Sequence, residues 1–182
     1  MHRPEMKNVL ENKILETDRL VLKEVSADDA AFVLDLLNQP SFKQYIGDRG
    51  VRTLEQAREY IDSRFTKSYR ENGFGLYLIE LKEAAVPIGL CGFVSRETLP
   101  DPDVGFALLP QYEKQGYAFE ASSAMMQYGR EKLGLERVLA ITTVDNISSG
   151  RLLGKIGLRF DREIDLNGET LKLYSTKSNG DG

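Results

Sequence analysis

Cysteine and histidine are almost absent from this sequence of 182 residues. Cys91 is the only cysteine, which excludes a disulfide within the chain and indicates a reducing compartment. Its apolar surroundings, residues 88–93, predict a small buried hydrophobic residue rather than a nucleophile. His2 is the only histidine and lies in an expected N-terminal tail. We therefore expect no Cys–His or Ser–His catalytic pair and no metal site.

Long apolar runs are also missing, and charges of the two signs nearly balance. Residues 1–13 lack an apolar core of signal-peptide length, and no stretch is long enough to span a membrane. We therefore expect a cytoplasmic protein that does not bind membranes. The 24 basic and 28 acidic side chains give a net charge of −4. This charge disfavours nucleic acid as the main ligand and favours cationic substrates.

Length and hydrophobic periodicity predict a single α/β domain with one mixed sheet and short flexible tails, placed at residues 1–13 and 177–182. The predicted strands cover residues 15–25, 74–81, 86–95, 104–109 and 137–143, and two more flank the hairpin signal Asn167-Gly168. The predicted helices cover residues 26–38, 53–69, 116–133 and 146–156. The unit from Val104 to Thr143 is expected to be a right-handed parallel crossover.

The segment from Leu109 to Ala118 joins a strand to a helix without a capping side chain. The first turn of a helix has four unpaired backbone N–H groups, which Ser, Thr, Asp or Asn usually cap. None of these occurs in the segment, and Gly116 stands at the helix start instead. An uncapped start with glycine favours a bound anion. The alternative is an ordinary turn with water on the free amides.

The last predicted helix begins with two polar residues of different character. Asn146 is a good N-cap, which by itself explains its presence. Ser149 shares the apolar stripe of Leu152, Leu153 and Ile156 at helical spacing, so its hydroxyl should be buried and need a partner. That partner is either the carbonyl one turn back or a ligand.

Five segments together resemble the GNAT superfamily of N-acetyltransferases, most closely the branch that includes the ribosomal-protein N-terminal acetyltransferases. They are Leu15–Leu22, Asp103–Phe106, Gln115–Ala121, Asn146–Ser149 and Lys155–Leu158. The resemblance covers about residues 14–176. It implies an acyl-CoA N-acyltransferase fold, a mostly antiparallel sheet with a central parallel β-α-β unit and flanking helices. It also implies an enzyme that transfers acetyl from acetyl-CoA to a primary amine.

By this resemblance, acetyl-CoA binds to backbone groups on both sides of the loop that leads to Gly116. The pyrophosphate is expected on the backbone amides of Gln115, Gly116, Tyr117 and Ala118, with Lys114 nearby. The pantetheine arm should pair with the strand Phe106, Ala107 and Leu108, as an added strand does. The Leu108 N–H is the expected donor to the thioester oxygen.

Two catalytic side chains follow from the same resemblance. Asp103 is the expected base for the amine, directly or through water, although Pro102-Asp103 is equally explained as a turn into the strand. Ser149 is the expected donor to the leaving thiolate, with water as the alternative. Asn146 should help to fix the pantetheine or a bound water.

Two positions depart from the family pattern. Glu113 stands where the phosphate loop often begins with Gln or Arg, and a carboxylate near a pyrophosphate is electrostatically unhelpful. Leu153 stands where many members carry a tyrosine general acid. These departures keep a different class of function open, a non-catalytic acyl-CoA sensor.

The acceptor amine is the least determined part of the prediction. The resemblance suggests a protein N-terminal α-amine, and a polyamine, amino acid or aminoglycoside is the alternative. Four aromatic residues are considered as its lining or as ordinary core and surface: Tyr45, Phe74, Tyr77 and Tyr174. The protein is expected to work as a monomer or homodimer.

Overall fold

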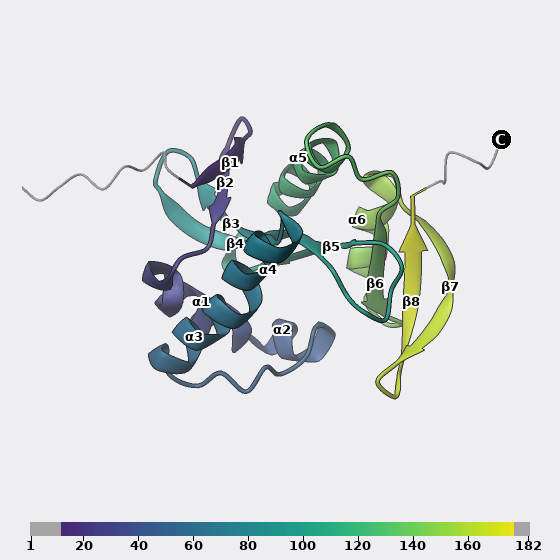
Figure 1. The fold of residues 1–182 in the computed structure, drawn as a ribbon, viewed down its shortest axis with the longest axis horizontal. Coiled ribbons are helices and arrows are strands. Elements are labelled where there is room, and N and C mark those ends of the chain that lie inside the picture. Colours follow the sequence, from purple (N-terminus) through teal and green to yellow (C-terminus); the bar gives the residue numbers. More distant parts are fainter. Residues whose placement is uncertain (1–11, 177–182) are drawn as a thin grey trace, which may run out of the picture.

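A mixed sheet of eight strands runs through the whole molecule (Figure 1). The computed structural model describes residues 12–176. In chain order the strands are β1 (Lys13–Glu16), β2 (Leu20–Glu24), β3 (Leu76–Leu81), β4 (Val86–Val94), β5 (Asp103–Leu108), β6 (Leu139–Thr143), β7 (Arg159–Leu166) and β8 (Glu169–Ser175). Their order in the sheet is β1-β2-β3-β4-β5-β6-β8-β7, and only β5 and β6 are parallel. The predicted mixed, mostly antiparallel sheet is confirmed.

The single strand predicted over residues 15–25 is wrong, because two strands and a turn occupy this segment. Thr17 closes the turn with its N–H on the Leu20 carbonyl at 2.8 Å. The Thr17 hydroxyl also accepts the Leu20 N–H at 3.1 Å. β1 and β2 therefore form a hairpin whose tip is held by a polar side chain.

Six α-helices accompany the sheet in the described residues. They are α1 (Ala30–Leu37), α2 (Pro40–Tyr45), α3 (Leu54–Tyr60), α4 (Lys67–Asn72), α5 (Tyr117–Glu131) and α6 (Ile147–Lys155). The helix predicted over 53–69 is interrupted by a π turn at Ile61–Thr66, and α2 was not predicted. Thr53 does cap α3, by accepting the Gln56 N–H at 3.1 Å. None of these helices combines the length and apolarity needed to cross a bilayer.

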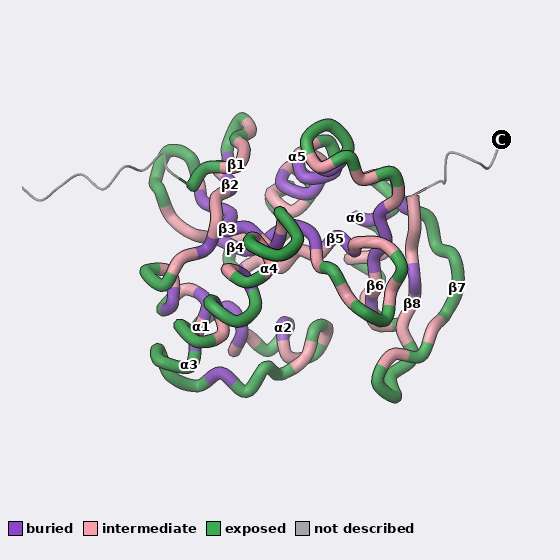
Figure 2. The backbone as a smooth tube through the Cα atoms, viewed as in Figure 1, coloured by how far each residue is buried: buried purple, intermediate pink, exposed green. Residues whose placement is uncertain are grey.

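The two faces of the sheet carry separate cores, visible as buried stretches of the backbone in Figure 2. On one face, α5 and α6 pack on β3–β6 through residues such as Met125, Leu153 and Phe93. On the other face, α1–α4 pack on β3 and β4 through residues such as Leu36, Phe65 and Leu78. Cys91 is fully buried in the first core, as predicted, and burial raises the pKa of its thiol to about 12.

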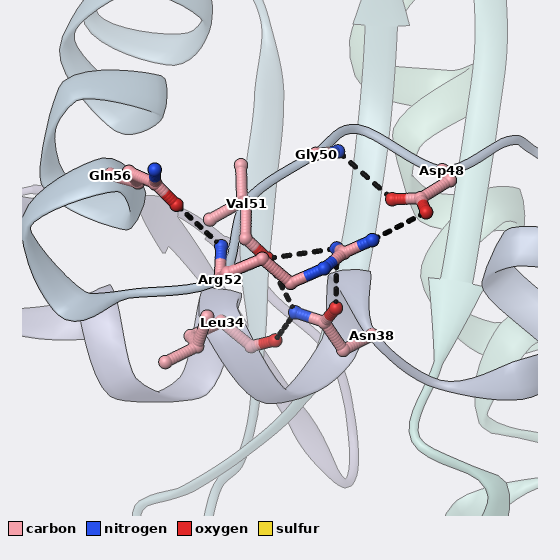
Figure 3. A network of polar contacts seen from close by, with 7 residues as sticks. All are labelled: Leu34, Asn38, Asp48, Gly50, Val51, Arg52 and Gln56. Carbon is pink, nitrogen blue, oxygen red and sulfur yellow. Dashed lines mark hydrogen bonds and ion pairs between the residues drawn. The ribbon is translucent and has the colours of Figure 1, made fainter.

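A polar network fixes the connection between α2 and α3 (Figure 3). The Arg52 guanidinium donates to the Asn38 amide oxygen at 2.8 Å and to the Asp48 carboxylate at 2.5 Å. Asn38 in turn donates to the carbonyls of Leu34 and Val51, both at 2.8 Å. The loop is thereby tied back to the end of α1.

The sheet opens between β5 and β6, which meet at a single pair, Asp103 and Leu139. The Leu139 N–H donates to the Pro102 carbonyl at 2.9 Å, and no later residue of β5 pairs with β6. β5 remains fully paired with β4 on its other side. One edge of β5 is therefore free along most of its length, in the middle of the sheet.

Candidate active site

Strand alternation decides which groups of β5 face this opening. The Leu109 N–H donates to the Ile88 carbonyl of β4 at 2.8 Å. Because the direction of backbone groups alternates, the amide groups of Phe106 and Leu108 point away from β4, into the opening. Ala107 has its backbone groups on β4, so it can offer a ligand only its methyl group. The Leu108 N–H thus faces the opening, and its role as a donor to the thioester oxygen stays a prediction.

The start of α5 follows directly on this strand. Gly116 precedes the helix in a left-handed conformation, with φ of +83°, and no side chain caps it. Lys114 is also left-handed, with φ of 60°. The first N–H with a partner inside the helix is that of Glu120, on the Gly116 carbonyl at 3.0 Å. The amides of Tyr117 and Ala118 therefore lack helical acceptors, which is the arrangement that binds anions.

Arg19 is a residue of this region that sequence reasoning missed. Its guanidinium bonds the Glu120 carboxylate at 2.7 Å and the Gln115 carbonyl at 3.0 Å. It also lies 4.3 Å from the centre of the Tyr117 ring. Arg19 and Glu120 both lie in segments that carry the family resemblance, but only the fold shows that they meet.

Asp103 lies at the closed end of the opening. It is the first residue of β5 rather than part of a turn, and only 2% of it is exposed. Its carboxylate accepts a hydrogen bond from Arg96 Nε at 2.8 Å. Burial raises the pKa of the Asp103 carboxyl, and the Arg96 charge opposes that rise. A raised pKa makes this carboxylate a stronger base than an ordinary aspartate.

Space beside Asp103 is provided by one glycine of β5. Gly105 is the next residue on the same side of β5, and it pairs with Gly92 of β4. A Cβ on Gly105 would meet only the Leu76 side chain, at 3.6 Å. Asp103 and Leu108 are five residues apart, or about 16 Å along an extended strand. Asp103 can therefore act near the Leu108 N–H only through intervening water.

At the start of α6, the predicted cap is present. The Asn146 side chain accepts the Ser149 N–H at 3.2 Å. The Ser149 hydroxyl is half-buried and makes no hydrogen bond to the described residues, so the carbonyl one turn back is not its partner. By contrast, the Ser122 hydroxyl bonds the Ala118 carbonyl in that way. Ser149 retains its capacity to serve a ligand.

Three of the four aromatic candidates for the acceptor site, Phe74, Tyr77 and Tyr174, belong to the first hydrophobic core. Tyr77 is buried and stacks on Tyr69, with ring centres 5.3 Å apart. Phe74 packs edge-on against Phe93 in the same core. The Tyr174 hydroxyl lies 2.6 Å from where a Cβ on Gly150 of α6 would stand. Tyr45 is half-buried at the end of α2.

A cavity of about 560 Å³ lies beside the paired end of β5 and β6. Its lining includes Leu139, which is the partner of Asp103, and residues of the β7–β8 hairpin. Charged and polar side chains contribute to it, among them Arg137, Arg162 and Asp165. Asp103 itself is not among the residues that line this cavity.

The fold and this arrangement define an acyl-CoA-dependent acyltransferase, and comparison with known proteins identifies the family. The model of the acetyltransferase (GNAT) domain matches residues 19–159. The chain therefore belongs to the GNAT family of N-acetyltransferases.

Proteins similar to this chain in sequence or fold carry names with different acceptors or with none. An N-acetyltransferase of Bacillus subtilis strain 168, YoaA, is 31% identical over 147 residues, which are 80% of this chain and 82% of that protein. RimL, a ribosomal alpha-N-protein acetyltransferase in complex with coenzyme A, is 18% identical, with a TM-score of 0.78 over 93% of this chain and 99% of its own. SpeG, a spermidine N-acetyltransferase chimera from Vibrio cholerae and hSSAT, is 16% identical, with a TM-score of 0.70 over 86% and 94%. The fold alone is therefore compatible with both kinds of acceptor.

Proposed function

We propose that this N-acetyltransferase uses acetyl-CoA to acetylate a protein or peptide N-terminal α-amine. The observation that supports the cofactor is the presence of free backbone groups at two places, on the β5 edge at Phe106 and Leu108 and in the first turn of α5. The acceptor rests on the resemblance to the ribosomal-protein branch and on the net charge of −4, which suits basic targets. A small-molecule amine is the second candidate, because a structure of similar fold is named a spermidine N-acetyltransferase.

The residues present fit acetyl-CoA. Gly116 has no side chain beside the α5 amides, and among the described residues the only atom near its Cβ position is Arg19 Nη2, at 3.2 Å. The amides of Gln115–Ala118 would hold the pyrophosphate, with Lys114 beside them, and Phe106 and Leu108 would pair with the pantetheine arm. Asn146, at the start of α6, would bind the same arm or a water. When bound, acetyl-CoA supplies the acetyl group as a thioester.

Each step of the transfer has a residue of this chain to serve it. The Leu108 N–H donates to the thioester oxygen, on which negative charge develops. Asp103 would accept the proton of the attacking amine through a chain of waters, because it lies about 16 Å along β5 from Leu108. The Ser149 hydroxyl donates a hydrogen bond to the departing sulfur. Serine need not ionise in this role, because a thiolate is a weak base compared with an alkoxide.

We expect Ser149→Ala to lower kcat about tenfold to a hundredfold, because one hydrogen bond to a charged group is worth ~1.5–3 kcal/mol. High pH should not rescue the variant, since the amine proton is not what Ser149 handles. Steady-state rates from pH 6 to 9 check this, with Ser148→Ala, an exposed neighbour, as the control. Melting curves show whether α6 stays folded. Full activity in a folded Ser149→Ala protein would leave water as the donor.

The acceptor is tested by thiol release from acetyl-CoA across peptides, polyamines, amino acids and aminoglycosides. A peptide with a free α-amine should react, and the same peptide with a blocked N-terminus and an internal lysine should not. Faster reaction with spermidine or free amino acids than with every peptide contradicts the N-terminal proposal. Tight CoA binding without turnover on the whole panel favours the sensor function.

A further inference from the structure

Arg19 joins two parts of the chain that are far apart in sequence. Its backbone N–H and its Nε both donate to the Glu120 carboxylate, at 3.0 and 2.7 Å, across 101 residues. Nη1 donates to the Gln115 carbonyl at 3.0 Å. The Thr17 hydroxyl adds a bond to the same carboxylate at 2.5 Å. The β1–β2 turn thereby holds the peptide just before Gly116 and the first turn of α5.

These contacts contribute little to the stability of the fold. About 46% of the Arg19 side chain is exposed, and ion pairs in water are weak. Their geometry is nevertheless well defined, because a guanidinium donates in fixed directions and here also stacks on the Tyr117 ring. What the contacts fix is the local conformation of Gln115–Tyr117.

Charge gives Arg19 a second effect on the same site. Glu120 stands in the first turn of α5, close to the amides proposed to hold a pyrophosphate. Burial disfavours its ionisation, but bonds from Thr17 and Arg19 outweigh burial, so the pKa of Glu120 is lowered. An unneutralised carboxylate there would repel phosphate. Arg19 cancels that charge, and its Nη2 lies 3.2 Å from where a Cβ on Gly116 would stand.

We propose that Arg19 is a positioning residue for acetyl-CoA: it holds the Gln115–Tyr117 turn in its phosphate-binding form and neutralises Glu120. The inference rests on the proposed function, since it concerns the same cofactor site. It assigns to Arg19 control of affinity for the phosphate end of acetyl-CoA, and no part in the acetyl transfer itself.

The test compares Arg19→Ala, Arg19→Lys and Arg19→Ala/Glu120→Gln with the wild-type protein. Calorimetric titration with coenzyme A should show the Kd of Arg19→Ala raised about tenfold to a hundredfold, the range for losing a charge-assisted contact. Arg19→Lys should recover only part of it, because an ammonium cannot bond Glu120 and Gln115 in the same way. Adding Glu120→Gln should also recover part, by removing the repulsion.

Turnover separates positioning from general damage. With acetyl-CoA, Arg19→Ala should raise KM and leave kcat at saturation unchanged. With S-acetyl-pantetheine, which has no phosphates, kcat/KM should equal that of the wild-type protein. Arg52→Ala is the matched control, because Arg52 is equally exposed and ion-paired but lies at the α2–α3 loop; it should not change the Kd for coenzyme A.

The outcomes distinguish this inference from the function on which it rests. An unchanged Kd in Arg19→Ala overturns the inference alone, and so does an equal loss of kcat/KM with both acetyl donors. If Arg19→Ala/Glu120→Gln binds coenzyme A more weakly than Arg19→Ala, the proposal that Arg19 neutralises Glu120 is contradicted. A wild-type protein that binds no coenzyme A overturns the proposed function and the inference together.

Discussion

Gly116→Val should abolish the thermal stabilisation that acetyl-CoA gives the wild-type protein. A ligand at a hundred times its Kd stabilises the folded state by about 2.7 kcal/mol, or roughly 5–10 °C in Tm for a chain of this size. In the variant, a β-branched side chain would extend beside the free amides of α5 from a Cβ position only 3.2 Å from Arg19 Nη2. It would also strain a residue whose φ is +83°. Differential scanning fluorimetry with and without acetyl-CoA measures both effects.

A matched glycine separates backbone strain from loss of the site. Gly134 follows the end of α5, has φ of +66°, and has open space where a Cβ would stand. Gly134→Val should lower the Tm of the free protein for the same reason as Gly116→Val. It should keep the full shift on adding acetyl-CoA. A shift retained in Gly116→Val would remove the phosphate-loop assignment.

Asp103→Asn should lower kcat by roughly 10²–10⁴-fold at neutral pH, the usual contribution of a general base. Raising the pH should restore part of the rate, because more of the amine is then neutral without help. In the wild-type enzyme the base is the carboxylate, so activity should fall as the pH drops through the raised pKa of Asp103. Asp101→Asn, at a more exposed position nearby, should behave like the wild-type protein.

The activity loss expected for Asp103→Asn should not come from a loss of protein stability. The pKa of the Asp103 carboxyl is higher in the folded than in the unfolded protein, so its protonated form favours folding. This contribution is complete at pH below the unfolded pKa and is lost as the pH rises through the folded pKa. Replacing the charge by an amide therefore removes no stability at neutral pH through this linkage. The amide oxygen can still accept the Arg96 bond, and Arg96 also reaches solvent. A folded Asp103→Asn protein with full activity at every pH would make Asp103 structural and leave a solvent-derived base.

Features with local causes were predictable from the sequence. The cap at Asn146 and the hairpin at Asn167-Gly168, where both residues have positive φ, depend on neighbouring residues only. The start of α5 at Gly116 could be located for the same reason.

Features that depend on distant partners were not predictable. The β1–β2 turn needs Glu120 from α5, and sequence alone does not show that Arg19 faces Gln115. The pairing of Asp103 with Arg96 was missed too, because the residues stand on either side of a loop whose path no local pattern determines. The π turn at Ile61–Thr66 has no local signal that we recognise, and it keeps Phe65 in the core.

The early parting of β5 and β6 also bears on how the protein is handled. Unpaired strand edges recruit strands from other chains, and most sheets protect them at their rims. In this protein the open edge belongs to β5, at the centre of the sheet, and β5 contains neither a lysine nor a proline to prevent such pairing. A ligand that pairs with it would act as a removable strand. Preparations stripped of CoA should therefore aggregate sooner in storage than preparations saturated with CoA. The bound substrate would then protect the enzyme from aggregation.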